Sequence, residues 1–168
     1  MKNFSLSVIE EHPFFAGMNP QACETIAGCA VNERFNTGDY LFREGQPANK
    51  FYLIRHGSVA LEIHVPGRDP IIVDELHSGD ILGWSWLVIP HKRAYDARAM
   101  ELTRLISLDA ACLRGKYEND HTLAYELFKR FIPIMADRLA AARRQMLKRP
   151  LVSQTSQQGR FTAQRYRL

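Results

Sequence analysis

Residues 79–99, GDILGWSWLVIPHKRAYDARA, place a glycine-containing turn and an arginine within one short stretch of the chain. A predicted apolar strand over Ile81–Gly83 ends at the glycine. A short helical turn follows and carries four residues: Trp84, Ser85, Trp86 and Leu87. After a proline-containing loop, Arg93 starts the next predicted strand. Backbone N–H groups at the start of a helix, with a guanidinium close by, form a site for a small anion. The segment therefore predicts an anion-binding site.

Short β segments surround this candidate site from Val31 to Asp109. Turn residues separate runs of apolar and β-branched residues, which is typical of a sandwich or jelly-roll barrel of about eight strands. We predict a mainly β protein with strands at Tyr40–Phe42, Lys50–His56, Ser58–Val65, Pro70–Leu76, Ile81–Gly83, Ala94–Ala99 and Leu102–Leu108.

Two details of these strands can be tested directly. In Ser58–Val65 the residues alternate, so we expect one face to carry Val59, Leu61, Ile63 and Val65. Gly38-Asp39 and Gly79-Asp80 each precede a strand, which predicts two similar turns.

Helices are predicted on both sides of the β region. Among the first 30 residues, Ser7 and Glu10 fit a capping box, and Asn19-Pro20 fits the start of a helix that ends near Gly28. After the strands, Asp109 can cap a helix that stops near Gly115, and Asp120 can cap a longer one.

The last predicted helix carries an apolar seam with a heptad-like spacing. Its members are Phe128, Ile132, Met135, Leu139, Ala142 and Met146. Such a seam favours a homodimer through residues 132–147, although a helix lying on its own barrel is the alternative. Pro133 should kink or divide the helix. We expect a flexible basic tail over 150–168, because its residues are polar and aperiodic.

Composition limits the class of protein. The net charge is +4, and residues 131–168 hold eight Lys/Arg and one Asp. No apolar stretch is long enough to cross a bilayer, and the N-terminus does not resemble a secretory signal, so we expect a cytoplasmic protein with no membrane contact. The three cysteines have no metal-ligand spacing, and we interpret them as small buried hydrophobes: Cys23, Cys29 and Cys112.

Together, these elements resemble the cyclic nucleotide-binding domain of the cyclic-AMP receptor/FNR superfamily. The resemblance covers roughly residues 10–148, and its structural matches are Gly38-Asp39, Phe51-Leu53 with Gly57-Ser58-Val59, and Gly79-Asp80. It implies an eight-stranded jelly-roll barrel, or double-stranded β-helix, over about 31–109, with N-terminal helices and a long dimer helix. We therefore expect one domain over 1–149, with its C-terminal helices over about 109–149.

The resemblance also implies roles for individual residues. In the family, a turn beginning with Gly and a later Arg hold the cyclic phosphate. Gly83 matches that Gly, Arg93 matches that Arg, and Ala94 takes the small position after it. Arg138 lies at a position on the dimer helix that is also basic in the family. The implied ligand is a cyclic nucleotide, cyclic AMP or cyclic GMP, or another small anion, and no cofactor is implied with certainty.

Several positions depart from the family pattern. Trp84 stands where a Glu binds the ribose, Ser85 replaces a Leu, and Tyr95 replaces a small Ala. Trp cannot accept a hydrogen bond from a ribose hydroxyl. The tryptophans Trp84 and Trp86 would either line an apolar pocket and stack on a base, pack in the core, or fill the pocket altogether.

Three functions are compatible with these residues. The first is a non-enzymatic, ligand-sensing regulatory module that binds its ligand at Gly83–Leu87 and Arg93, and signals to an effector protein through its C-terminal helix. The alternative is a ligand-free dimerisation or scaffold module with a Trp-filled pocket. A third, an enzyme on a metal-binding barrel, is weak, because the histidines lack the expected spacing: His56, His64 and His77. Residues 151–168 are too few for a helix-turn-helix, so we expect no sequence-specific DNA binding.

Overall fold

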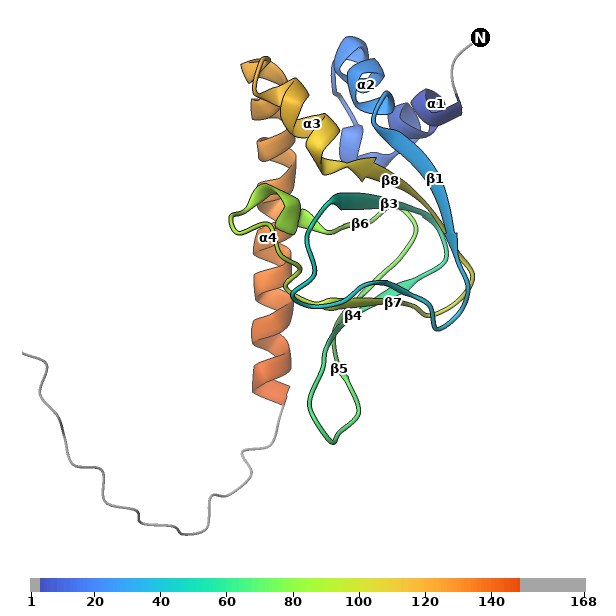
Figure 1. Ribbon diagram of the computed structural model, residues 1–168, viewed down its shortest axis with the longest axis vertical. Helices are drawn as coiled ribbons and strands as arrows, with labels where there is room; N and C mark the ends of the chain where they lie inside the picture. Colours follow the sequence, from blue (N-terminus) through green and yellow to red (C-terminus); the bar gives the residue numbers. More distant parts are fainter. Residues whose placement is uncertain (1–3, 149–168) are drawn as a thin grey trace, which may run out of the picture.

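Two four-stranded antiparallel sheets form the centre of the computed structural model, which describes residues 4–148 (Figure 1). Sheet A has the strand order β1-β8-β3-β6, and sheet B has the order β2-β7-β4-β5. The strands are β1 (Ala30–Phe35), β2 (Tyr40–Phe42), β3 (Lys50–His56), β4 (Val59–Ile63), β5 (Ile71–Leu76), β6 (Ile81–Leu82), β7 (Asp96–Ala99) and β8 (Thr103–Asp109). The prediction of a mainly β jelly roll with flanking helices is confirmed. The expected tail at 150–168 lies outside the described residues.

The helices lie before, within and after the strands. They are α1 (Phe4–Glu11), η1 (Pro13–Phe15), α2 (Pro20–Ala27), η2 (Trp84–Leu87), α3 (Ala110–Tyr117) and α4 (His121–Lys148). Side-chain caps begin three of them, because the carboxyl or amide oxygens of Asn19, Asp109 and Asp120 accept N–H groups at 2.7–2.9 Å. These three predicted helix starts are confirmed. The predicted capping box is wrong, because α1 begins at Phe4 and Ser7 lies inside the helix.

Two apolar clusters hold the layers together. The inner core lies between the sheets and includes Phe42, Tyr52, Ile54, Leu61 and Leu105. The outer core lies between sheet A and the helices, and it includes Ile9, Phe15, Phe51, Trp86, Ile106, Leu127 and Phe131. Figure 1 shows α1, α2 and α3 gathered beside β1 and β8, with α4 along one side of both sheets. Successive residues of β3 and β8 therefore point to different cores.

The two Gly-Asp turns have the same geometry, as predicted. Gly38 and Gly79 have φ values of 87° and 93°, which favour glycine because a Cβ is strained there. In each turn the following aspartate accepts the N–H three residues earlier, at 2.7 Å for Asp39 and 2.8 Å for Asp80. The carboxylates thus fix the chain direction before β2 and β6.

The predicted alternation in Ser58–Val65 holds only for its first half. Val59 and Leu61 lie in the inner core, but the register against β5 shifts between Leu61 and Glu62. This irregularity is a β-bulge, which changes the direction of the side chains after it. As a result, Ile63 and Val65 line a hollow of about 220 Å³ together with Met146 of α4. Sequence alternation alone does not reveal the extra residue.

The interpretation of all three cysteines as simple buried hydrophobes is wrong. Cys29, just before β1, and Cys112 of α3 form a disulfide with a Cα–Cα distance of 5.8 Å. Their separation of 83 residues gives no sequence signal, since β1 and β8 bring them together only in the fold. Cys23 is a free thiol in the outer core, as interpreted.

Helix α4 continues through Pro133 without dividing. One face of α4 packs on its own domain through Leu123, Leu127, Phe131 and Ala141. For this face, the predicted alternative of a helix that lies on its own barrel is confirmed. The predicted seam lies on another face, where Ile132, Leu139 and Met146 are exposed. Tertiary packing of the buried face stabilises the helix despite the hydrogen bond that proline removes.

Within residues 4–148, no helix combines the length and apolar character that crossing a membrane requires.

Candidate anion-binding site

The glycine of the predicted site begins the η2 turn in a left-handed conformation. Gly83 has φ 94° and is the N-cap of η2. A Cβ built at this residue would lie 2.6 Å from Nη1 of Arg93 and 3.2 Å from the Lys50 carbonyl oxygen. Both the backbone angle and the available space therefore require glycine. The turn and the arginine, ten residues apart in sequence, are in direct contact as the sequence predicted.

The Arg93 side chain points into the molecule and is only 4% exposed. Its Nη2 donates to the Lys50 carbonyl at 2.6 Å, and its Nη1 donates to the Gly83 carbonyl at 3.3 Å. The guanidinium carbon lies 4.0 Å from the centre of the Phe42 ring and 5.8 Å from that of Tyr52. Within residues 4–148, its Nε has no hydrogen-bond partner.

No carboxylate of the described residues pairs with Arg93. Asp96, three residues after Arg93, has other partners: its carboxylate accepts from Arg43 at 3.0 Å and from the Glu44 N–H at 2.7 Å. Burial lowers the pKa of Arg93, against a smaller opposing contribution from Tyr52. A buried cation without a counter-charge is costly, and an anion would relieve that cost.

Trp86 connects the η2 turn to the helices. Its side chain is fully buried in the outer core, stacked on Phe51 with ring centres 5.4 Å apart and edge-to-face with Phe131 at 5.8 Å. Arg114 of α3 donates to the Trp86 carbonyl at 3.3 Å. The indole therefore packs on the helix side of sheet A, whereas Arg93 contacts the inner-core rings Phe42 and Tyr52.

The other predicted site residues take varied positions. Trp84 and Leu87 are half-buried against the outer core, and Ser85 is buried. Ala94 is exposed, and Tyr95 packs against the inner core before β7 begins at Asp96. Arg138 projects from α4, forms an ion pair with Asp74 of β5 and donates to the Ile81 carbonyl at 3.3 Å.

Sequence reasoning missed three partners of Arg93. Phe42 and Tyr52 supply the aromatic faces, and Lys50 supplies a backbone carbonyl. Because side chains alternate along a strand, the sequence of β3 could have shown that Tyr52 lies on the other face of the sheet from Phe51, toward the inner core. No sequence signal identifies a carbonyl acceptor, because every residue type carries one.

The chain is a jelly roll in which an arginine is buried beside a glycine turn. Residues 32–120 match the family model described as "Cyclic nucleotide-binding domain", and the chain belongs to this family. Domains of the family are typically regulatory and non-catalytic. Within residues 4–148, no group of three or more His, Cys, Asp or Glu side chains could hold a metal ion.

Individual relatives agree with the family match. The chain is 30% identical over 94 residues to cyclic nucleotide-gated ion channel 18 of Arabidopsis thaliana, and 32% identical over 78 residues to the cAMP-dependent protein kinase regulatory subunit of Dictyostelium discoideum. These matches cover 54% and 45% of this chain, but only 13% and 24% of those proteins. A crystal structure of a putative cyclic nucleotide-binding protein from Geobacter metallireducens superposes with a TM-score of 0.72 at 26% identity, covering 82% of this chain and 99% of that one.

Proposed function

We propose that residues 1–149 form a non-catalytic sensor domain that binds a cyclic nucleotide, with cyclic AMP and cyclic GMP as the first candidates. Arg93 would hold the cyclic phosphate. One observation carries this proposal: a guanidinium that is 4% exposed, has a free Nε and meets no carboxylate among the described residues. A cyclic phosphodiester supplies the missing negative charge through charge-assisted hydrogen bonds.

The alternative, a scaffold with a Trp-filled pocket, receives less support. Trp86 is fully buried, but its ring contacts are Phe51, Tyr117 and Phe131, which belong to the outer core or pack against it. The rings beside the guanidinium are Phe42 and Tyr52 instead. The indole of Trp86 therefore does not take the place of a ligand at Arg93. Half-buried Trp84 remains available to contact a base, where a family Glu would bind the ribose.

A short series of contacts connects the proposed binding site at Arg93 to α4. Arg93 bonds the Gly83 carbonyl, η2 begins at Gly83, and Trp86 of η2 packs on Phe131 of α4. Arg138 makes a second connection between α4 and the strand before η2. A ligand that moves η2 would shift the packing of α4, which an effector protein would detect.

The decisive experiment replaces the guanidinium. We expect Arg93→Gln to weaken cyclic AMP and cyclic GMP binding by about 10- to 100-fold, because hydrogen bonds to a charged group contribute about 1.5–3 kcal/mol. Isothermal titration calorimetry and ligand-induced shifts in Tm would measure the loss. Without ligand, the variant should unfold at the same temperature or higher, since it removes a buried, unpaired charge.

Arg68→Gln is the matched control, because this exposed arginine lies in the turn between β4 and β5. It should bind both nucleotides as the parent does. If the parent binds neither nucleotide, or if Arg93→Gln binds them equally well, the ligand site is wrong.

We also propose that α4 pairs with a second copy of the chain through residues 132–147. The supporting observation is the row of exposed apolar residues along α4, with Ile132 58%, Leu139 73% and Met146 76% exposed. A helix face of this kind buries its apolar seam against a matching helix.

We expect Leu139→Glu to produce monomers at concentrations where the parent sediments as a dimer in analytical ultracentrifugation. His121→Glu, at the exposed start of α4, should leave the dimer intact. A parent protein that sediments as a monomer would contradict the proposal.

A further inference from the structure

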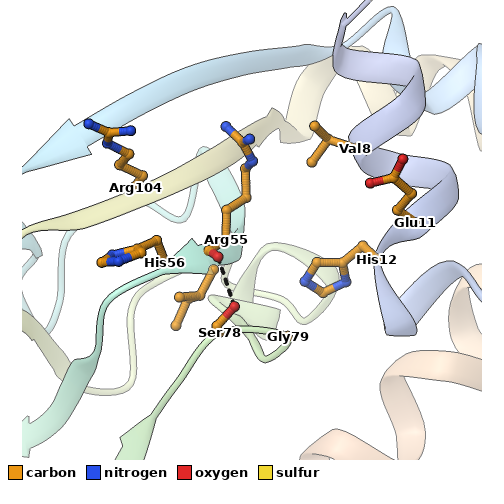
Figure 2. A pocket seen from close by; sticks show the side chains of 9 residues that line it. Val8, Glu11, His12, Arg55, His56, Ser78, Gly79 and Arg104 are labelled. Carbon is orange, nitrogen blue, oxygen red and sulfur yellow. Dashed lines mark hydrogen bonds between the residues drawn. The ribbon is translucent and has the colours of Figure 1, made fainter.

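A second hollow, of about 500 Å³, lies on the other side of sheet A from the inner core (Figure 2). It is lined by residues of α1, of β3, of β8 and of the turn before β6, together with His12. The position of the hollow depends on which residues of β8 the helices cover. Ile106 and Leu108 on this face are covered by the helices, but Arg104, two residues earlier, is exposed. The hollow is therefore the place where the helical cover of sheet A ends.

A row of basic side chains crosses the sheet at this place. Arg104 of β8 pairs in register with Arg34 of β1 and with His56 of β3, so the three side chains share one face. The register of β3 shifts between Ile54 and His56, and this bulge lets Arg55 line the same hollow. Like charges directly opposite each other destabilise a sheet. Within residues 4–148, no ion pair or side-chain hydrogen bond neutralises Arg34 or Arg104.

His12 lines the helix side of the hollow, and one of its ring nitrogens has no hydrogen-bond partner among the described residues. His12 is only 5% exposed, and its Nδ1 accepts the Phe14 N–H at 3.3 Å. The neutral ring therefore carries its proton on Nε2. Nε2 is buried and has no partner among the described residues. Burial lowers the pKa of His12, against smaller opposing contributions from the Ile54 backbone and the Asp80 charge. The Ile54 carbonyl also accepts the Gly79 N–H at 2.9 Å.

Neither of the two acidic groups near the hollow forms an ion pair with Arg104 or His56 in the part of the chain that the structure describes. Asp80 accepts the His77 N–H and so fixes its own turn. Glu11 lines the hollow from α1, and Figure 2 shows it on the helix side, across from Arg104 and His56. The strand side of the hollow is thus basic, and the helix side carries one carboxylate and one N–H donor. A ligand with an anionic group at one end fits this arrangement of charge.

We propose that this hollow binds a small ligand through an anionic oxygen group, a phosphate or a carboxylate. Arg104 and His56 hold the anion, and His12 Nε2 donates a hydrogen bond to a ligand oxygen. The volume lies within the range of small-molecule sites. The site is separate from Arg93 and does not depend on cyclic nucleotide binding.

Imidazole ¹⁵N NMR of the full chain tests the proposal, with inorganic phosphate and acetate as two separate probes at constant ionic strength. We expect at least one probe to shift the resonances of His56, which lies beside Arg104, saturably and with a millimolar Kd typical of a few charge-assisted bonds. The probe that saturates identifies the anionic group. Arg104→Gln should weaken that binding about tenfold, and Arg68→Gln, a matched loss of charge at a distant turn, should not change it.

Three results would overturn the proposal. The first is no shift of His56 by either probe up to about 50 mM, well above the expected Kd. The second is a shift that rises linearly without saturating, which indicates general ionic screening or exchange with water in the hollow. The third is equal binding by the parent and Arg104→Gln. Arg93→Gln should leave the His56 response intact, which separates this site from the proposed nucleotide site.

Discussion

We expect Trp86→Ala to lower the free energy of unfolding by about 3–5 kcal/mol, the range for removing a large aromatic side chain from a core. Trp86 is fully buried and contacts Phe51 of β3, Tyr117 of α3 and Phe131 of α4. The truncation therefore removes contacts that join η2 to the sheet and to both C-terminal helices. Urea denaturation followed by circular dichroism would measure the loss.

Trp84→Ala is the matched control, because the two indoles stand two residues apart on the same turn. Trp84 is half-buried at the edge of the outer core, so its truncation should cost about 1 kcal/mol. Trp86→Phe, which keeps a ring against Phe51, should lie between the two alanine variants. Equal losses for Trp84→Ala and Trp86→Ala would show that the outer core is not organised around Trp86.

The part of the fold that the sequence predicts is the part that local chemistry decides. Asn19, Asp109 and Asp120 begin helices because their side chains satisfy nearby N–H groups, which requires no knowledge of the rest of the chain. The strand positions follow from turn residues and apolar runs in the same way. The contact between Gly83 and Arg93 was predictable because a short loop joins a strand end to the next strand.

The features that were missed depend on distant segments. The Cys29–Cys112 disulfide needs the pairing of β1 with β8, and the bulge after Leu61 needs the pairing of β4 with β5. The inward direction of Arg93 depends on two carbonyls and one ring, which leave no pattern in the sequence. Ser7 and Glu10 matched a capping box by type and spacing, yet the helix begins earlier at Phe4.

The second large effect concerns a buried ion pair on sheet B. The Glu62 side chain is fully buried, and Nε of Arg98 donates to its two carboxylate oxygens at 3.0 and 3.2 Å. Nη2 of Arg98 also donates to Glu62 Oε1, and these bonds raise the pKa of Arg98. Arg98 is 30% exposed at its side chain, so water reaches only one of the two partners. The pair joins β4 to β7, the strand that follows Arg93 in the chain.

We expect Arg98→Met to cost about 2–4 kcal/mol in urea denaturation, because it leaves the Glu62 carboxylate buried without a counter-charge. The lower bound allows for the water that already reaches Arg98. Removing both charges, in the double variant Glu62→Leu with Arg98→Met, should recover most of that loss, since an apolar pair of similar volume needs no desolvation. Lys92→Met, at an exposed position before β7, is the control for losing a basic side chain and should be nearly neutral. A double variant as unstable as Arg98→Met would mean that the bidentate geometry itself positions β7, and cyclic nucleotide binding at Arg93 should then weaken in both variants.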